Sequence, residues 1–218
     1  FLYNVIFKNY RMFIKSWGII LRNIKYGDHT CIIDIYSSEA GFLSFIVRSQ
    51  SGKNRNNLRR LFQPITQIEF NADLRATSKL LHFRDVYSVN TYTDIYSNPF
   101  KTSIALFLAE FLYSVLRNEG KNKPLSSWLV YSLKWFNECR KGQANFHLVF
   151  MMNILHFLGL YPNITGYRSG DCFDLLNACF VSSIPVHGNV LGPLDSEKIL
   201  FISRMNYANM HLFKMNHI

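Results

Sequence analysis

The sequence has few cysteines, and they lie far apart. Its 218 residues include four: Cys31, Cys139, Cys172 and Cys179. A disulfide framework needs a denser set, so this layout is typical of reduced thiols in the cytoplasm. Zinc sites usually hold their thiolates as C-x2-C or C-x4-C pairs, whereas Cys172 and Cys179 are more widely spaced, with His187 downstream. We therefore predict no metal site.

Catalytic and nucleotide-binding motifs are missing as well. The histidines form no H-x3-H or H-E-x-x-H pair, and no G-x-S-x-G elbow is present. No G-x4-G-K-[ST] or G-x-G-x-x-G loop occurs, so we predict no bound nucleotide and no other cofactor. Asp171 and Asp174 are close in sequence, but a two-metal nuclease needs several converging acids. The sequence predicts a binding protein with no catalytic residues.

Long apolar runs are also absent. The most apolar stretch, residues 146–161, is interrupted by His147, Asn153 and His156 and is shorter than the ~20 residues that span a bilayer. The first residues lack the cleavage site of a secretory signal. We therefore predict a cytoplasmic protein with no membrane partner, in which residues 1–11 are a leader or upstream remnant before Met12.

Acidic residues are scarce relative to basic ones. The 24 Lys and Arg against 14 Asp and Glu give a net charge of +10, which favours a polyanionic partner. Residues 47–64, VRSQSGKNRNNLRRLFQP, contain cations and no acid: Arg48, Lys53, Arg55, Arg59 and Arg60. Such cations supply sequence-independent affinity for phosphates, and the intervening amides can bond phosphate or sugar. A solvated loop has the same composition, so charge alone leaves both interpretations open.

The hydrophobic pattern up to about residue 95 indicates strands. Apolar residues alternate with the period of two expected of half-buried strands at 16–26, 29–36, 42–48, 66–73 and 79–89. Five short strands with a longer insert before the fourth predict a small β-barrel compatible with an OB-fold, with the basic stretch at one rim. Exposed aromatic residues beside this stretch could stack on bases, whereas buried ones would be core; the candidates are Tyr26, Phe42, Phe45 and Phe62.

After residue 95 the pattern indicates helices. Asn98 is a candidate N-cap with Pro99 at the first helical position, and Gly120 follows the end of this helix. Further helices are predicted at 124–140, 145–158 and about 195–213, with an irregular, glycine-rich connection at 162–194. The predicted fold class is therefore α+β, with an N-terminal five-stranded OB-fold barrel at 12–95 and a C-terminal all-helical domain at 96–218.

Residues 18–48, GIILRNIKYGDHTCIIDIYSSEAGFLSFIVR, resemble the opening of the RecO family of bacterial recombination mediators. The likeness includes the GIIL run, the YGD turn and Arg48 at the end of the third strand. It continues in LFQPITQIEF at 61–70, with its L-Q-P step into the next strand, and in LGLYPN at 158–163. The order and spacing of these motifs cover nearly the whole chain from Met12 onward.

This resemblance implies a non-enzymatic, nucleoid-associated DNA-repair protein. Members of the family bind single- and double-stranded DNA, anneal complementary strands and, with RecR, help to load RecA onto DNA coated by single-strand-binding protein (SSB). The DNA-binding surface implied for this chain consists of Arg48, Lys53, Arg55, Arg59, Arg60, Arg22 and Lys25. The family also binds the acidic, apolar tail of SSB in its helical domain. Candidates here are Lys134, Arg140 and Lys141 near Trp128 and Trp135, although tryptophans at this spacing are also typical of a core.

The sequence departs from the family in its cysteines. Many members carry two C-x2-C pairs after the third helix, and this chain does not, so the resemblance carries over no zinc site. We expect packing to hold residues 162–194 instead, through Tyr167, Phe173, Leu175, Leu176 and Phe180.

Two alternatives stay open. An RNA-binding OB-fold protein would prefer RNA and would not anneal DNA strands. An interaction scaffold with an incidental basic loop would have negligible affinity for nucleic acid at physiological salt.

Overall fold

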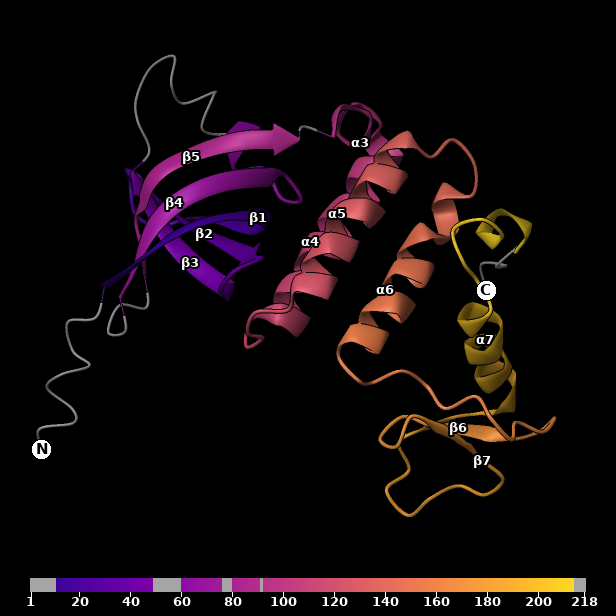
Figure 1. Cartoon of the computed structure of the whole chain (residues 1–218). Helices are drawn as coiled ribbons and strands as arrows, with labels where there is room; N and C mark the ends of the chain where they lie inside the picture. Colours follow the sequence, from indigo (N-terminus) through magenta and orange to yellow (C-terminus); the bar gives the residue numbers. More distant parts are fainter. Residues whose placement is uncertain (1–10, 49–59, 76–79, 91, 214–218) are drawn as a thin grey trace, which may run out of the picture. The chain divides into compact units, whose positions relative to one another are not determined.

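The computed structural model describes residues 11–48, 60–75, 80–90 and 92–213 (Figure 1). The chain divides into two compact units, which we call unit 1 (Phe1–Glu138) and unit 2 (Cys139–Ile218). Unit 1 contains a five-stranded sheet followed by helices, and unit 2 contains helices and a three-stranded sheet. The predicted division of the sequence near residue 95 stays a prediction.

The five strands predicted for the N-terminal region are confirmed. They are β1 (Arg11–Lys25), β2 (Thr30–Ser37), β3 (Gly41–Arg48), β4 (Gln67–Arg75) and β5 (Phe83–Asn90). Their order in the sheet is β3-β2-β1-β4-β5, and every neighbouring pair is antiparallel. The long strand β1 is central because its two halves pair with different partners: residues from Gly18 onward pair with β2, and residues up to Ile19 pair with β4.

The core of this sheet lies on the face where alternate apolar side chains converge. Its buried members are Ile14, Ile20, Ile33, Ile35, Phe45, Phe62, Ile68, Phe70, Ala72 and Leu81. The ring of Phe45 stacks on that of Phe83 and meets Phe70 edge-on, with centroids 3.8 and 5.4 Å away. Burial of such rings removes a large apolar area from water, which makes this cluster the main stabilising feature of the sheet.

The prediction of a closed barrel is wrong in this structure. The edge strands β3 and β5 do not pair along their length in the described residues. Within the part of the chain that the structure describes, they meet only through Leu81, which precedes β5 and forms an isolated bridge to Phe45. The Ile46 amide donates to the Leu81 carbonyl and the Leu81 amide donates to the Ser44 carbonyl, both at 2.9 Å. A single bridging residue cannot supply the continuous ladder that closure needs.

Three helices follow the sheet in unit 1: α3 (Thr93–Ser97), α4 (Pro99–Leu116) and α5 (Lys123–Glu138). The predicted start of α4 is confirmed, because the Asn98 side chain accepts hydrogen bonds from the amides of Phe100 and Lys101 and Pro99 is the first helical residue. In the described part of the chain, α4 is the one helix whose length and composition would suit a membrane span, a property it shares with core helices of soluble proteins.

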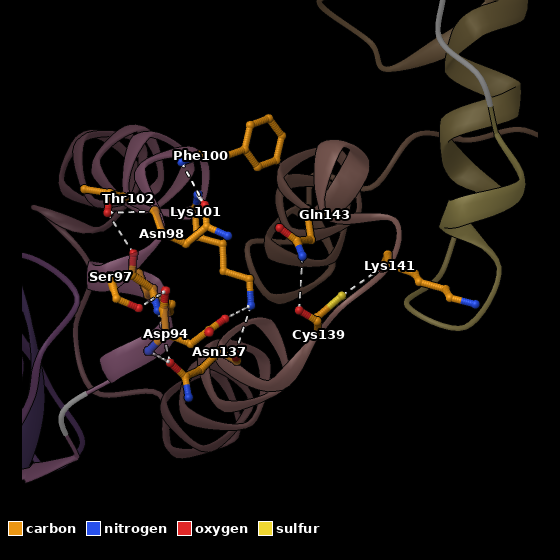
Figure 2. A network of polar contacts seen from close by, with 11 residues as sticks. Asp94, Ser97, Asn98, Phe100, Lys101, Thr102, Asn137, Cys139, Lys141 and Gln143 are labelled. Carbon is orange, nitrogen blue, oxygen red and sulfur yellow. Dashed lines mark hydrogen bonds and ion pairs between the residues drawn. The ribbon is translucent and has the colours of Figure 1, made fainter.

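The three helices are joined by a buried lysine (Figure 2). Lys101 of α4 has no exposed surface. Its ammonium group donates to Asp94 Oδ2 of α3 at 2.5 Å and to the Asn137 carbonyl near the end of α5 at 2.9 Å. The Asn137 side chain in turn accepts from the amides of Asp94 and Ile95, which caps the first turn of α3. A buried cation is tolerated here because both an acid and a helix-terminal carbonyl satisfy it.

The sheet is joined to the helices through the loop between α4 and α5. The Tyr36 hydroxyl donates to the Gly120 carbonyl at 2.9 Å, and the Phe42 amide donates to the Glu119 carbonyl at 3.2 Å. Gly41 has a φ of +72°, and a β-carbon at this position would lie 2.4 Å from the backbone of Gly120. Glycine is therefore required at residue 41 for both its conformation and its size.

Unit 2 is not purely helical, which corrects the predicted all-helical domain. It contains α6 (Phe146–Phe157) and α7 (Pro193–Ser203), and between them lie the short strands β6 (Cys172–Asp174), β7 (Cys179–Val181) and β8 (Val190–Leu191), in the order β7-β6-β8. These strands occupy the connection predicted to be irregular. Strands of two or three residues show no measurable alternation, so hydrophobic periodicity could not reveal them.

The last helix is shorter than predicted. Helix α7 ends at Ser203, and between it and residue 213, where the description ends, only the short 3-10 turn η3 (Met210–Leu212) follows. Two asparagines account for the break: Asn209 Oδ1 accepts from the Asn206 amide at 2.7 Å, and Asn206 Oδ1 accepts from the amides of Ala208 and Asn209. Side chains that bond to nearby backbone in this way compete with helical hydrogen bonds.

Asp174 organises the three-stranded sheet. Its carboxylate accepts hydrogen bonds from the amides of Leu176 and Asn177, from Asn177 Nδ2 at 2.7 Å and from His187 Nε2 at 3.2 Å. The Asn177 side chain, and then the two amides and His187, lower the pKa of Asp174 from 3.8 to about 2, against the opposing effect of burial. His187 Nδ1 accepts from the Asn189 amide, so this network joins the β6–β7 turn to the β7–β8 loop.

The packing expected for residues 162–194 is confirmed in part. Phe173 is buried, and the Phe180 ring contacts both Phe173 and Tyr167, with centroids 5.1 and 4.7 Å away. The expectation is wrong for Leu175 and Leu176, which are 52% and 62% exposed. They follow Asp174 in the turn, where the backbone is held by hydrogen bonds to the carboxylate instead of by apolar contacts.

Candidate nucleic-acid interface

Two of the predicted DNA-binding residues lie at the same end of the five-stranded sheet. Lys25 ends β1 and is paired with Cys31, while Arg48 ends β3 and is paired with Thr30. Since Cys31 and Thr30 are neighbours at the start of β2, the two cations flank one end of that strand. Both Lys25 and Arg48 are exposed. We call this part of unit 1 the basic end of the sheet.

Arg60 belongs to the same region. It is exposed and begins a short helical turn, and the Asn23 side chain donates to the Phe62 carbonyl in that turn at 3.2 Å. Because Asn23 lies two residues before Lys25 on β1, this contact places the turn next to the basic end. Lys53, Arg55 and Arg59 lie outside the described residues, in the segment whose two ends are Arg48 and Arg60.

Only one of the predicted stacking aromatics is well exposed. Tyr26 is 59% exposed in the turn between β1 and β2, where its backbone forms two hydrogen bonds with Thr30. Phe45 and Phe62 are buried in the core, and the half-buried Phe42 packs edge-on against Tyr113. Tyr26 is therefore the aromatic ring at the basic end that a base could reach.

Arg22 is engaged within the protein. Its Nε donates to Asp34 Oδ2 at 3.0 Å, and its guanidinium carbon lies 3.6 Å from the centroid of the Tyr113 ring. Asp34 is almost fully buried and also accepts from the Ser44 hydroxyl at 2.6 Å. These contacts join β1, β2 and α4, so a phosphate would have to compete with an ion pair and a cation–π contact for this side chain.

The predicted partner-binding cations are all exposed, but they belong to different units. Lys134 lies on α5 in unit 1, whereas Arg140 and Lys141 belong to unit 2. The neighbouring Trp128 and Trp135 are half-buried, and Phe136 is buried in the core.

Other chemistry is sparse in the described part of the chain. No three His, Cys, Asp or Glu side chains there converge as metal ligands. His187, close in sequence to Cys172 and Cys179, hydrogen-bonds to Asp174 and Asn189. His29 is exposed in the same turn as Tyr26. Nothing in the local sequence singled it out, and only the strand register places it at the basic end.

A small antiparallel sheet with exposed cations and a tyrosine at one end is typical of oligonucleotide-binding modules. The chain belongs to the RecO family: the family model described as "Recombination protein O N terminal" matches residues 12–92, and "Recombination protein O C terminal" matches residues 96–192. The predicted family is thus confirmed, and with it a role in DNA repair and recombination.

Several proteins named DNA repair protein RecO are similar over most of their length. The Phocaeicola vulgatus protein is 45% identical over 207 residues, which cover 95% of this chain and 86% of that protein. The Bacteroides fragilis protein is 44% identical over 94% of this chain and 85% of its own length. The Porphyromonas gingivalis protein is 32% identical over 94% of this chain and 85% of its own length.

Proposed function

We propose that this chain is a non-enzymatic recombination mediator that binds single- and double-stranded DNA through the basic end of its five-stranded sheet. The sheet would serve as the DNA-binding module, as an OB-fold does. The observation that carries the proposal is the convergence of Lys25, Arg48 and Arg60, all exposed, at the end of the sheet where Tyr26 is also exposed. Cations there would neutralise phosphates, and the ring would stack on an unpaired base.

The basic segment between Arg48 and Arg60 extends this proposal. Its cations Lys53, Arg55 and Arg59 would add phosphate contacts, while Arg22 would contribute less because Asp34 and Tyr113 already engage it. Contacts of this kind go mostly to the backbone of the nucleic acid and carry little sequence information. The protein would therefore bind DNA with little dependence on its sequence.

Family membership supports the further steps. We propose that the protein anneals complementary strands and acts with RecR in the cytoplasm, at the nucleoid, to load RecA onto SSB-coated DNA. Lys134, Arg140 and Lys141 are the cations proposed to bind the acidic tail of SSB, since a carboxylate needs such a partner. No cofactor or nucleotide enters this proposal.

The test is fluorescence anisotropy of a labelled single-stranded DNA across a salt series. Four or five phosphate contacts predict that log affinity falls with log salt with a slope of about −3, and the double variant Arg48→Glu/Arg60→Glu should make it shallower by about 1.4. Arg168→Glu/Arg204→Glu is the matched control, because both residues are exposed arginines of unit 2 and their replacement changes the net charge by the same amount.

Competition with RNA of the same sequence separates the alternatives. Preferential binding of RNA, without annealing of DNA strands, would favour the RNA-binding OB-fold protein. Absence of binding even at low salt would favour the interaction scaffold. Equal losses of DNA affinity in Arg48→Glu/Arg60→Glu and in Arg168→Glu/Arg204→Glu would mean that the basic end has no special role.

A further inference from the structure

The outer face of the five-stranded sheet differs from its basic end. On β1, Ile14 and Ser16 point into the core, so Phe13, Lys15 and Trp17 lie on the opposite face. The register continues this face across the neighbouring strands of Figure 1, through Glu69, Asn71 and Asp73 on β4 and Asp85 and Tyr87 on β5. Among the side chains that the structure describes, this face carries three acids (Glu69, Asp73 and Asp85), two bases (Lys15 and Arg84) and three aromatic rings (Phe13, Trp17 and Tyr87).

Residues paired across adjacent strands form rows on this face, and one such row already binds an arginine. Phe13 is paired with Asp73, and Arg84 of β5 donates to Asp73 Oδ2 from Nε at 2.9 Å and from Nη2 at 2.7 Å. The guanidinium carbon of Arg84 lies 5.3 Å from the centroid of the Phe13 ring. An acid and an aromatic ring on adjacent strands thus bind a guanidinium group by an ion pair and a cation–π contact.

A second row has the acid and the rings but no arginine. Trp17 is paired with Glu69, and Glu69 is paired with Tyr87, so an exposed carboxylate lies directly between two aromatic residues. Paired residues on one face have β-carbons about 5 Å apart, within reach of one ligand group. Glu69 forms no ion pair or hydrogen bond with any side chain that the structure describes, and this includes Lys15, one row away.

We propose that Trp17, Glu69 and Tyr87 form a binding site for an arginine side chain of a partner protein. Glu69 would accept the N–H donors of the guanidinium, and the rings would contact its faces, as Asp73 and Phe13 do for Arg84. A carboxylate between two rings fits a guanidinium group and disfavours a phosphate, and the neighbouring Phe13–Asp73 pair binds the guanidinium of Arg84 by the same two kinds of contact. The site is separate from the basic end and does not depend on DNA binding.

The probe is a capped Gly-Arg-Gly peptide titrated into the full chain, followed by the indole N–H signals in NMR spectra. The chain has three tryptophans, and the signal lost in Trp17→Phe identifies Trp17. We expect the Trp17 signal to shift and the other two to stay. The arginine peptide should bind about fivefold more tightly than a capped Gly-citrulline-Gly peptide, which has the same shape without the charge.

Glu69→Gln should abolish the preference for arginine over citrulline, and Tyr87→Ala should weaken binding of the arginine peptide. The control Glu197→Gln removes the same charge from an exposed position of α7 and should leave both unchanged. A capped Gly-Lys-Gly peptide that binds as tightly as the arginine peptide would overturn the guanidinium site in favour of simple charge attraction. The site would be overturned altogether if the Trp17 signal did not move and if the folded Glu69→Gln variant bound the arginine peptide as the unmodified protein does.

Discussion

The two sheets of this protein are stabilised in different ways. The strands of unit 1 are 8 to 15 residues long and converge on a shared apolar core, whereas those of unit 2 have two or three residues and are organised around one carboxylate. A long sheet buries enough apolar surface to be stable by packing, and its polar contacts mainly fix the helices beside it. A sheet this short depends on local hydrogen bonds, as small domains depend on metals or disulfides.

The largest expected effect concerns the junction between sheet and helices in unit 1. A β-carbon in Gly41→Ala would lie 2.4 and 2.5 Å from backbone atoms of Gly120 and Glu119, at a φ of +72°. Left-handed strain and the clash together should lower the free energy of unfolding by about 3 to 4 kcal/mol. Urea titration followed by tryptophan fluorescence measures this, because Trp17, Trp128 and Trp135 all belong to unit 1.

Gly166→Ala in unit 2 is the matched control for Gly41→Ala. Gly166 has a φ of +80°, but a β-carbon there would meet nothing within 4 Å. Only the conformational cost of about 1 to 2 kcal/mol remains, and hydrogen exchange of the surrounding peptides reports it. Similar losses for the two variants would refute the steric role of the Gly41–Gly120 contact.

The next largest effect is expected at the buried cation that joins α3, α4 and α5. Lys101→Met keeps an unbranched side chain, one atom shorter, but removes the ammonium group that donates to Asp94 and to the Asn137 carbonyl. We expect unit 1 to lose about 3 kcal/mol, because removing one partner leaves a poorly solvated charge behind. Tryptophan fluorescence in a urea titration measures the loss.

Lys198→Met provides the comparison for Lys101→Met. Lys198 pairs with Asp195 at 2.7 Å, but both side chains are exposed by 41% or more. A surface pair of this kind contributes only about 0.5 kcal/mol. A stability loss in Lys101→Met no greater than in Lys198→Met would show that the lysine is not essential for joining the helices.

A smaller effect, dependent on pH, is expected at Asp174 in unit 2. The pKa of this carboxyl falls from 3.8 to about 2 on folding, so its hydrogen bonds stabilise the folded state above about pH 5, and this contribution is lost as the pH falls through 4 toward 2. Asp174→Asn should remove this stabilisation at neutral pH, so that the stability of the three-stranded sheet no longer falls between pH 5 and 2. Hydrogen exchange of peptides from β6 to β8, measured from pH 7 to 2, tests this.

The exposed Asp195 supplies the control for the pH experiment. Asp195→Asn should leave the exchange rates and their pH dependence as in the unmodified protein, because this carboxylate takes part only in a surface pair. Retention of the acid-sensitive profile in Asp174→Asn would locate the titrating group elsewhere.

The smallest expected effect concerns binding and leaves stability unchanged. Tyr26→Ala should weaken single-stranded DNA binding roughly fivefold, or about 1 kcal/mol, through loss of one stacked base. Tyr131→Ala is the control, since Tyr131 on α5 is also 59% exposed. Equal affinities of the two variants in the anisotropy assay would exclude Tyr26 as a stacking residue.

Much of unit 1 was predictable because its signals are local and repeated. Alternation over eight or more residues identifies each strand, and Asn98 with Pro99 identifies the start of α4. The candidate site was predictable only as a set of cations. Which of them lie together depends on pairing between strands, and nothing in the sequence shows that Asp34 and Tyr113 engage Arg22.

The sequence by itself determined the family, the strands of unit 1, the start of α4 and the concentration of positive charge between Arg48 and Arg60. The tertiary structure alone decided the open sheet, the small sheet around Asp174, the exposure of Tyr26 and the row Trp17–Glu69–Tyr87. The reason is physical: periodicity and capping act between residues close in the chain, whereas burial and cross-strand neighbours depend on which distant segments come to lie together.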